Sequence, residues 1–155
     1  MAGQYAAYVM RMRVRLLEKA EVMVSMIRNE INYVALPSND LIEALVKIEE
    51  FKELKFIDVC LRYMTDGFTF PEAWRKSLYD KRSVVFFRKS DIEVIEAFGE
   101  RFGVTDAEGQ ISNCELCVGR LKTNLSEAKR DFDQYSKLAC GLGFLSGLGI
   151  IIVFL

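Results

Sequence analysis

The sequence predicts an all-α protein, a small bundle of about six helices whose long C-terminal helix continues into a membrane anchor. Three observations lead to this fold class. Apolar residues recur at intervals of three and four along most of the chain, which is the period of a helix with one buried face. Three segments have the Ser/Thr-x-x-Glu form of a capping box, which marks the start of a helix. The last eighteen residues carry no charged side chain.

A long first helix is predicted from residue 9 onward. Its apolar stripe consists of Val9, Met12, Leu16, Ala20, Met23, Ile27, Ile31 and Val34. Pro37 ends this helix, because proline lacks a backbone donor and disfavours the helical conformation in the residue before it. A stripe of this length needs a partner helix of similar length.

Three shorter helices follow. Residues 38–40 (Ser-Asn-Asp) are cap-type residues that open a short helix ending near Ile48. A third helix carries apolar residues between positions 56 and 64 and ends at Asp66-Gly67. The capping box of residues 69–72 opens a fourth, which contains Trp74 and is expected to pack into the core.

The segment 83–87 is rich in β-prone residues, but a lone five-residue strand has no partner here. We therefore expect a buried connection or irregular helix. The capping box at 90–93 opens a fifth helix, which Gly103 stops, and the box at 105–108 opens the sixth.

The last helix has the most regular apolar pattern in the chain. Its seam consists of Ile111, Cys114, Val118, Leu121, Leu125, Ala128, Phe132 and Tyr135, spaced alternately three and four apart. This is a heptad pattern over more than three heptads, and nothing interrupts it before the glycines of the tail. We expect one continuous helix that pairs with the first helix.

Residues 138–155 are predicted to be a C-terminal transmembrane anchor. A helix of eighteen residues is about 27 Å long, close to the roughly 30 Å hydrocarbon core of a bilayer. Within this tail Ala139, Gly143 and Gly147 recur at intervals of four, a spacing that lets a second membrane helix approach closely. Glycine is also simply common in membrane helices, which is the alternative explanation.

Positive charge orients the domain relative to the membrane. The basic residues near the two ends of the domain are Arg11, Arg13, Arg15, Lys19, Lys129, Arg130 and Lys137. Because such charge is retained on the cytoplasmic side, we expect residues 11–137 to be a cytoplasmic helical bundle domain. Residues 1–10 resemble the last turns of a further membrane helix, but are too short to span alone.

The composition excludes several kinds of active site. The chain has no histidine, so it has no Ser-His-Asp triad, Cys-His pair or HExxH zinc site. With a net charge of −1 and no basic patch around its aromatic residues, it is not expected to bind nucleic acid. Cys114 and Cys117 form a CxxC, but Cys114 occupies the seam, so both are expected to be buried structural cysteines. We predict no enzyme activity, cofactor, metal or small-molecule substrate; a redox enzyme using these two cysteines is the alternative.

One helix face carries a pattern that could bind a partner. Glu93, Glu96 and Glu100 step along one side of the fifth helix, with Arg101 beside them. A solvated face is the usual meaning of such a pattern, and a partner-docking patch is the other.

Four segments resemble one known family. Residues 36–45 are similar to the "LP-x-x-ALE" region of the stage III sporulation protein AB family, and residues 90–96, 98–103 and 106–110 are also similar to it. The heptad helix that runs into a glycine-rich terminal anchor resembles the end of that family's proteins. Family members usually begin with an additional membrane helix, so either the start of this chain is truncated or this member has a single anchor.

The resemblance implies a function. Proteins of that family belong to the channel complex between mother cell and forespore in endospore-forming bacteria, and resemble the cytoplasmic domains of the inner-membrane platform protein of type II secretion and type IV pilus systems. It implies a non-enzymatic platform in the mother-cell membrane around the forespore. Its partners would be a stage III sporulation protein AA-like ATPase and other channel components. The ATPase would contact Glu93, Glu96, Glu100, Arg101, Asp106, Glu108 and Gln110. The alternative is a generic tail-anchored helical tether that pairs with another membrane protein.

Overall fold

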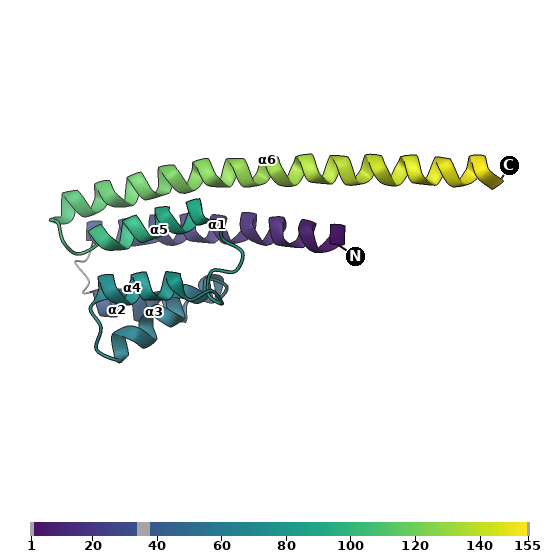
Figure 1. Cartoon of the computed structure of the whole chain (residues 1–155). Coiled ribbons are helices and arrows are strands. Elements are labelled where there is room, and N and C mark those ends of the chain that lie inside the picture. The colour runs from purple at the N-terminus through teal and green to yellow at the C-terminus, as the bar shows by residue number, and fades with distance from the viewer. Residues whose placement is uncertain (1, 34–37, 155) are drawn as a thin grey trace.

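In the computed structural model, the residues whose backbone is described form six α-helices and one short 3₁₀ helix (Figure 1). The backbone is described for residues 2–33 and 38–154, and side-chain surroundings for residues 3–31 and 40–139. The elements are α1 (Ala2–Tyr33), α2 (Ser38–Lys47), η1 (Glu49–Phe51), α3 (Lys55–Thr65), α4 (Phe70–Tyr79), α5 (Lys89–Arg101) and α6 (Ala107–Phe154). No strand occurs in these two described ranges, so the all-α prediction is confirmed.

The two long helices, α1 and α6, lie side by side and antiparallel (Figure 1). Their facing residues are the two predicted stripes: Leu16, Ala20 and Met23 of α1 are buried, as are Leu121, Leu125 and Ala128 of α6. The Tyr135 hydroxyl donates to the carbonyl oxygen of Gly3 at 2.8 Å, which places the start of α1 beside the middle of α6. The predicted pairing and the predicted continuous last helix are both confirmed.

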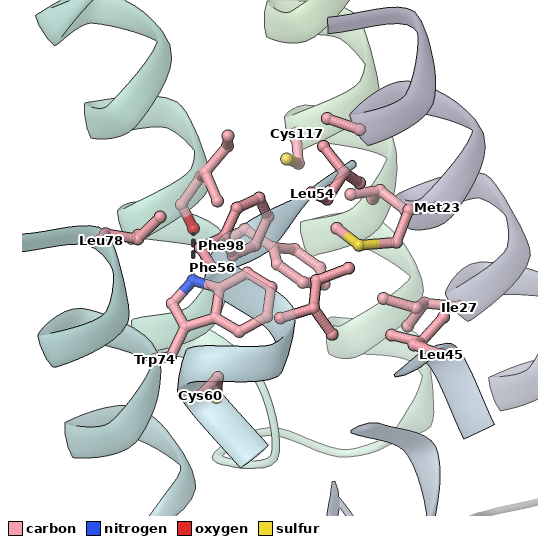
Figure 2. Close-up of a cluster of buried hydrophobic side chains, with 14 of the residues drawn as sticks. Met23, Ile27, Leu45, Leu54, Phe56, Cys60, Trp74, Leu78, Phe98 and Cys117 are labelled. Carbon is pink, nitrogen blue, oxygen red and sulfur yellow. Dashed lines mark hydrogen bonds between the residues drawn. The ribbon is translucent and has the colours of Figure 1, made fainter. Parts of the chain in front are cut away.

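The remaining helices pack on one side of this pair (Figure 1). Helix α5 lies along α6 and also contacts α4, while α2, α3 and α4 form the outer layer. The core between them is aromatic, and Phe56, Trp74 and Phe98 are its largest buried side chains (Figure 2). The Trp74 indole donates from Nε1 to the Ile95 carbonyl oxygen at 2.8 Å, so its one polar atom is satisfied inside the core.

Trp74 fits against α5 because residue 99 is glycine. A Cβ at Gly99 would lie 2.1 Å from Trp74 Cδ1, so any other residue would displace the indole ring. The absence of a side chain at residue 99 therefore lets the indole of α4 pack directly against the backbone of α5.

Of the three predicted capping boxes, one is confirmed and two are displaced. Glu72 Oε2 accepts bonds from the backbone N–H and the hydroxyl of Thr69, as predicted. Helix α5 begins before Ser90, because the carboxylate of Asp91 accepts the backbone N–H of Arg88 at 2.9 Å. At the start of α6 it is Asp106, and not Thr105, that caps the helix, since its Oδ1 accepts the Gly109 N–H at 2.9 Å. A carboxylate is the stronger acceptor and displaces the hydroxyl one residue earlier.

The two helix stops predicted at glycines and the central connection are confirmed. Gly67 and Gly103 adopt φ values of +96° and +80°, a left-handed conformation that favours glycine at the end of a helix. Segment 83–87 is an irregular turn in which Ser83, Val84 and Phe87 are buried.

Among the residues whose placement the structure describes, no helix is both long enough and apolar enough to span a membrane. The side chains from residue 140 onward, which include Gly143 and Gly147 of the predicted anchor, lie outside the described residues. The anchor therefore stays a prediction. Pro37, predicted to end the first helix, also lies outside the described residues.

Candidate interaction surface

The predicted acidic face lies on the outer side of α5. Glu93 and Glu100 are exposed and Glu96 is half-buried, and Glu93 Oε1 lies 3.7 Å from Lys89 Nζ on the same helix. On the opposite side of α5, Asp91, Ile95 and Phe98 are buried in the interior, and Phe102, the residue after the helix, is buried with them. The three glutamates thus share a solvent-facing surface, which we call the acidic face.

Arg101 does not share this face. It lies at the edge of α5 that faces α6, where it lines a small surface depression of about 30 Å³ with Val94, Ala97, Asn113, Leu116 and Arg120. We call this the α5–α6 groove. The structure therefore separates the predicted partner residues into an acidic face and a groove edge.

The other three predicted partner residues lie at the start of α6. Asp106 is the capping residue of the helix, and the half-buried Gln110 donates from Nε2 to the Thr105 carbonyl oxygen at 3.1 Å. Both side chains therefore build the turn from α5 into α6. Glu108 is exposed in the first turn of α6, where its negative charge is favoured by the helix dipole.

A buried ion pair joins α5 to the long helices. Asp91 is fully buried, and its two oxygens accept bonds from Arg13 of α1: Nε at 2.8 Å and Nη2 at 3.0 Å. Oδ1 also accepts the amide of Asn124 on α6 at 2.9 Å. One carboxylate thus holds α1, α5 and α6 together, directly beneath the acidic face.

This buried ion pair was not predicted from the sequence, although the spacing of its two residues indicates it. Arg13 falls three and four residues before Leu16 and Leu17, and therefore on the apolar stripe of α1. Asp91 likewise falls on the buried side of α5, four residues before Ile95. A charged residue at a core position on each of two helices is the pattern that a buried ion pair leaves in a sequence.

The basic cluster predicted to orient the domain is largely engaged within it. Arg13 is buried and paired with Asp91, so its charge is neutralised inside the domain. The guanidinium of Arg11 lies 5.6 Å from the centre of the Phe132 ring, and Lys19 Nζ donates to a backbone carbonyl oxygen of η1 at 2.6 Å. Arg15 Nη2 lies 2.5 Å from Glu53 Oε1. These side chains join α1 to its neighbours.

The CxxC cysteines are buried in the interior, as predicted. Cys114 and Cys117 are free thiols on α6. Burial raises the pKa of Cys114 to about 11 and that of Cys117 to about 12. A redox cysteine needs the opposite, an accessible thiol whose pKa is lowered, so the structure disfavours the redox alternative. Within the described side chains there is also no group of three or more potential ligands that could hold a metal ion.

The heptad seam of α6, which the tether alternative would use as its interface, is occupied within this chain. A tether that pairs through the last helix would need the heptad seam to face another chain. Cys114, Leu121 and Leu125 instead pack in the core that α6 shares with α1. The described part of the seam is therefore used within this chain.

Comparison with known proteins identifies the family. The family model described as stage III sporulation protein AB matches residues 1–155. Stage III sporulation protein AB of Bacillus subtilis (strain 168) is 31% identical over 81 residues, which cover 52% of this chain and 47% of that relative. The aligned region thus spans about half the length of the curated relative.

A solved structure agrees at the level of the fold. The structure titled stage III sporulation protein AB (SpoIIIAB) superposes with a TM-score of 0.61 and covers 79% of this chain and 97% of its own. At 20% identity this likeness concerns the fold alone. On the family match over its whole length, the chain belongs to the stage III sporulation protein AB family.

Proposed function

We propose that this chain is a non-enzymatic platform of the secretion-like channel between mother cell and forespore. In this proposal residues 138–155 anchor it in the mother-cell membrane, with the helical domain on the cytoplasmic side. The domain couples a stage III sporulation protein AA-like ATPase to the other channel components. Membership of a sporulation protein family supports the setting.

One observation carries the proposal: α6 is a single helix from Ala107 to Phe154. Its first part is built into the core of the domain, and its last part is the uncharged segment. A continuous helix has no flexible joint, so a displacement of the domain would be passed directly to the proposed anchor. A tethered enzyme has no need of such continuity, whereas a mechanical coupler does.

The second part of the proposal concerns how a movement of a bound partner would reach α6. The acidic face lies on α5, and Asp91 on the opposite side of the same helix bonds to Arg13 and Asn124. A partner that displaces α5 would therefore also exert a force on α1 and α6 through this buried, charged contact. Packed side chains with fixed hydrogen bonds transmit such a displacement better than an exposed loop.

The ATPase contact can be tested on the acidic face. We expect the double substitution Glu96→Lys and Glu100→Lys, in the full chain in lipid nanodiscs, to weaken ATPase binding about tenfold or more by charge repulsion. The matched control is Glu43→Lys with Glu50→Lys, which makes the same change of charge at exposed positions away from α5. Binding that is unchanged in the first variant would rule out this face as the docking surface.

The anchor can be tested separately. We expect the full chain to remain in the membrane fraction after alkaline carbonate extraction, because about eighteen uncharged residues suffice for a nearly complete span. A variant that ends at Lys137 should be extracted. Extraction of both proteins would remove the anchor from the proposal.

A further inference from the structure

The α5–α6 groove combines an apolar floor with two basic ends. Its floor is formed by Val94 and Ala97 of α5 and by Leu116 of α6, which is 44% exposed. An aliphatic side chain this accessible, between two helices, is a site that a partner's apolar side chain can cover. Phe98 and Cys117 lie below and are buried, so the floor is firmly supported.

The two basic ends are Arg101 and Arg120. The bonds from Asn113 to the Phe98 carbonyl oxygen and from Asn124 to Asp91 show that α5 and α6 run antiparallel here. Arg120 is therefore level with Val94, and Arg101 stands at the other end of the groove. Since these levels are seven residues apart on α5, the backbone positions of the two arginines are about 10 Å apart along the helix axis.

Arg101 and Arg120 are distinguished by their position on either side of Leu116. Arg13, Arg15, Arg28 and Arg88 each form an ion pair with a carboxylate, whereas other described arginines, such as Arg75 and Arg130, do not. Among the side chains that the structure describes, neither Arg101 nor Arg120 has such a pair, and both are exposed. The groove therefore presents uncompensated positive charge around an apolar centre.

We infer that the α5–α6 groove binds an acidic amphipathic segment of the ATPase, with an apolar side chain on Leu116 and a carboxylate at each arginine. A helical segment meets this geometry when two Asp or Glu residues about seven positions apart flank one large apolar residue. This inference rests on the proposed function and specifies which surface makes the main contact with the ATPase. An apolar side chain buried in a desolvated site contributes more to binding than exposed charges do, so the groove is the stronger candidate.

The test uses the full chain in nanodiscs, with the ATPase as the probe. Arg101→Glu combined with Arg120→Glu should weaken binding about tenfold or more, by repulsion of the carboxylates. Arg75→Glu with Arg130→Glu is the matched control, because it makes the same change of charge at exposed positions outside the groove. A second pair separates the apolar contact: Leu116→Gln should weaken binding, whereas Val22→Gln, at a position equally exposed, should not. All variants should retain the thermal unfolding temperature of the wild type within a few degrees, since the changed residues lie on the surface.

The outcomes separate the inference from the proposed function. Binding that is lost by the acidic-face variant but kept by both groove variants would overturn the inference and leave the function standing. Weaker binding by the control pairs to the same extent as by the groove pairs would also overturn it. A wild-type chain that does not bind the ATPase at all would overturn both. If replacing one Asp or Glu of the ATPase by lysine restored its binding to the Arg101→Glu variant, that residue would be identified as the contact of Arg101.

Discussion

Arg13 and Asp91, on the first and fifth helices, form a two-point ion pair in the interior of the domain. The bonds measure 2.8 Å and 3.0 Å, and the side chains are 5% and 0% exposed. Asp91 accepts two further bonds, from Asn124 and from the Arg88 backbone, so its oxygens are fully used. Arg13 Nη1 is buried without a partner among the described residues. The pair therefore depends on Asp91 to offset a buried positive charge.

Removing the carboxylate should destabilise the fold strongly. In Asp91→Asn the guanidinium of Arg13 would remain buried without a counter-charge, and we expect a loss of about 3–5 kcal/mol in the free energy of unfolding. Urea denaturation of the tail-less domain, followed by circular dichroism, measures it. The double variant Arg13→Met, Asp91→Leu should lose less than Asp91→Asn, because no uncompensated charge is left.

The exposed pair between Lys129 and Glu18 is the control, since it also joins two long helices. Glu18→Gln should cost at most about 1 kcal/mol, because exposed ion pairs contribute little. Equal losses for Glu18→Gln and Asp91→Asn would contradict the role given to burial.

Gly99 should tolerate no side chain. In Gly99→Ala the new methyl would overlap the ring of Trp74, and we expect a cost of about 1–3 kcal/mol with a displaced indole. The chain has one tryptophan, so its fluorescence reports the displacement directly. Gly119→Ala is the control: a Cβ there meets nothing within 4 Å, and alanine should stabilise α6 by up to about 1 kcal/mol. An unshifted emission maximum in Gly99→Ala would show that the ring is not held as described.

The buried thiols should be inert and should weaken the fold at high pH. Burial raises the pKa of Cys60 and Cys117 to about 12 and that of Cys114 to about 11, from an ordinary value of 9.0. In a Cys140→Ser variant, these three cysteines should react with a thiol reagent at pH 8 only after unfolding by urea.

The sign of the pH dependence follows from the same shifts. Below pH 9 the thiols are protonated in both states, and their contribution to stability is fully present. As the pH rises from about 9 towards 12, the unfolded chain ionises first and stability falls. Cys117→Ala should show a shallower decline over this range than the unsubstituted chain. Rapid modification of the folded chain at pH 8 would contradict the burial.

The domain should be monomeric without its tail. Since the seam of α6 packs against α1 in the same chain, residues 2–139 should elute as a monomer in size-exclusion chromatography with light scattering. Leu121→Ala should lower the free energy of unfolding by about 2–5 kcal/mol through a cavity in this seam. A dimer that dissociates in Leu121→Ala would instead favour the tether that pairs with another chain.

Local pattern predicted much of this fold because helices are local structures. The stripe from Met12 to Ile31, the seam from Ile111 to Tyr135, and the glycine stops at 67 and 103 follow from spacing and from the conformational freedom of glycine. The two displaced caps show the limit of such rules. Ser90 and Asp91 at one helix start, and Thr105 and Asp106 at the other, are all acceptors of the capping type, and only the bonds formed in the structure select one of each two.

The candidate surface was predicted less completely. Helical spacing correctly put Glu93, Glu96 and Glu100 on one face, because that depends on a single helix. It could not separate Arg101 from them, since the groove that Arg101 lines exists only when α6 lies beside α5. Asp106 and Gln110 were assigned to a partner but build the turn into α6.

The sequence by itself determined the helical class, the two long stripes, their pairing and the uncharged end of the last helix. These depend on composition and on a period of 3.6 residues, which neighbouring positions encode. Only the tertiary structure decided that Arg13 is an interior residue and not part of a basic surface. It also decided that Asp91 joins three helices, and that Arg101 and Arg120 bracket one groove. Each of these facts depends on residues far apart in the chain, and the energy of a charge is set by what the fold places around it.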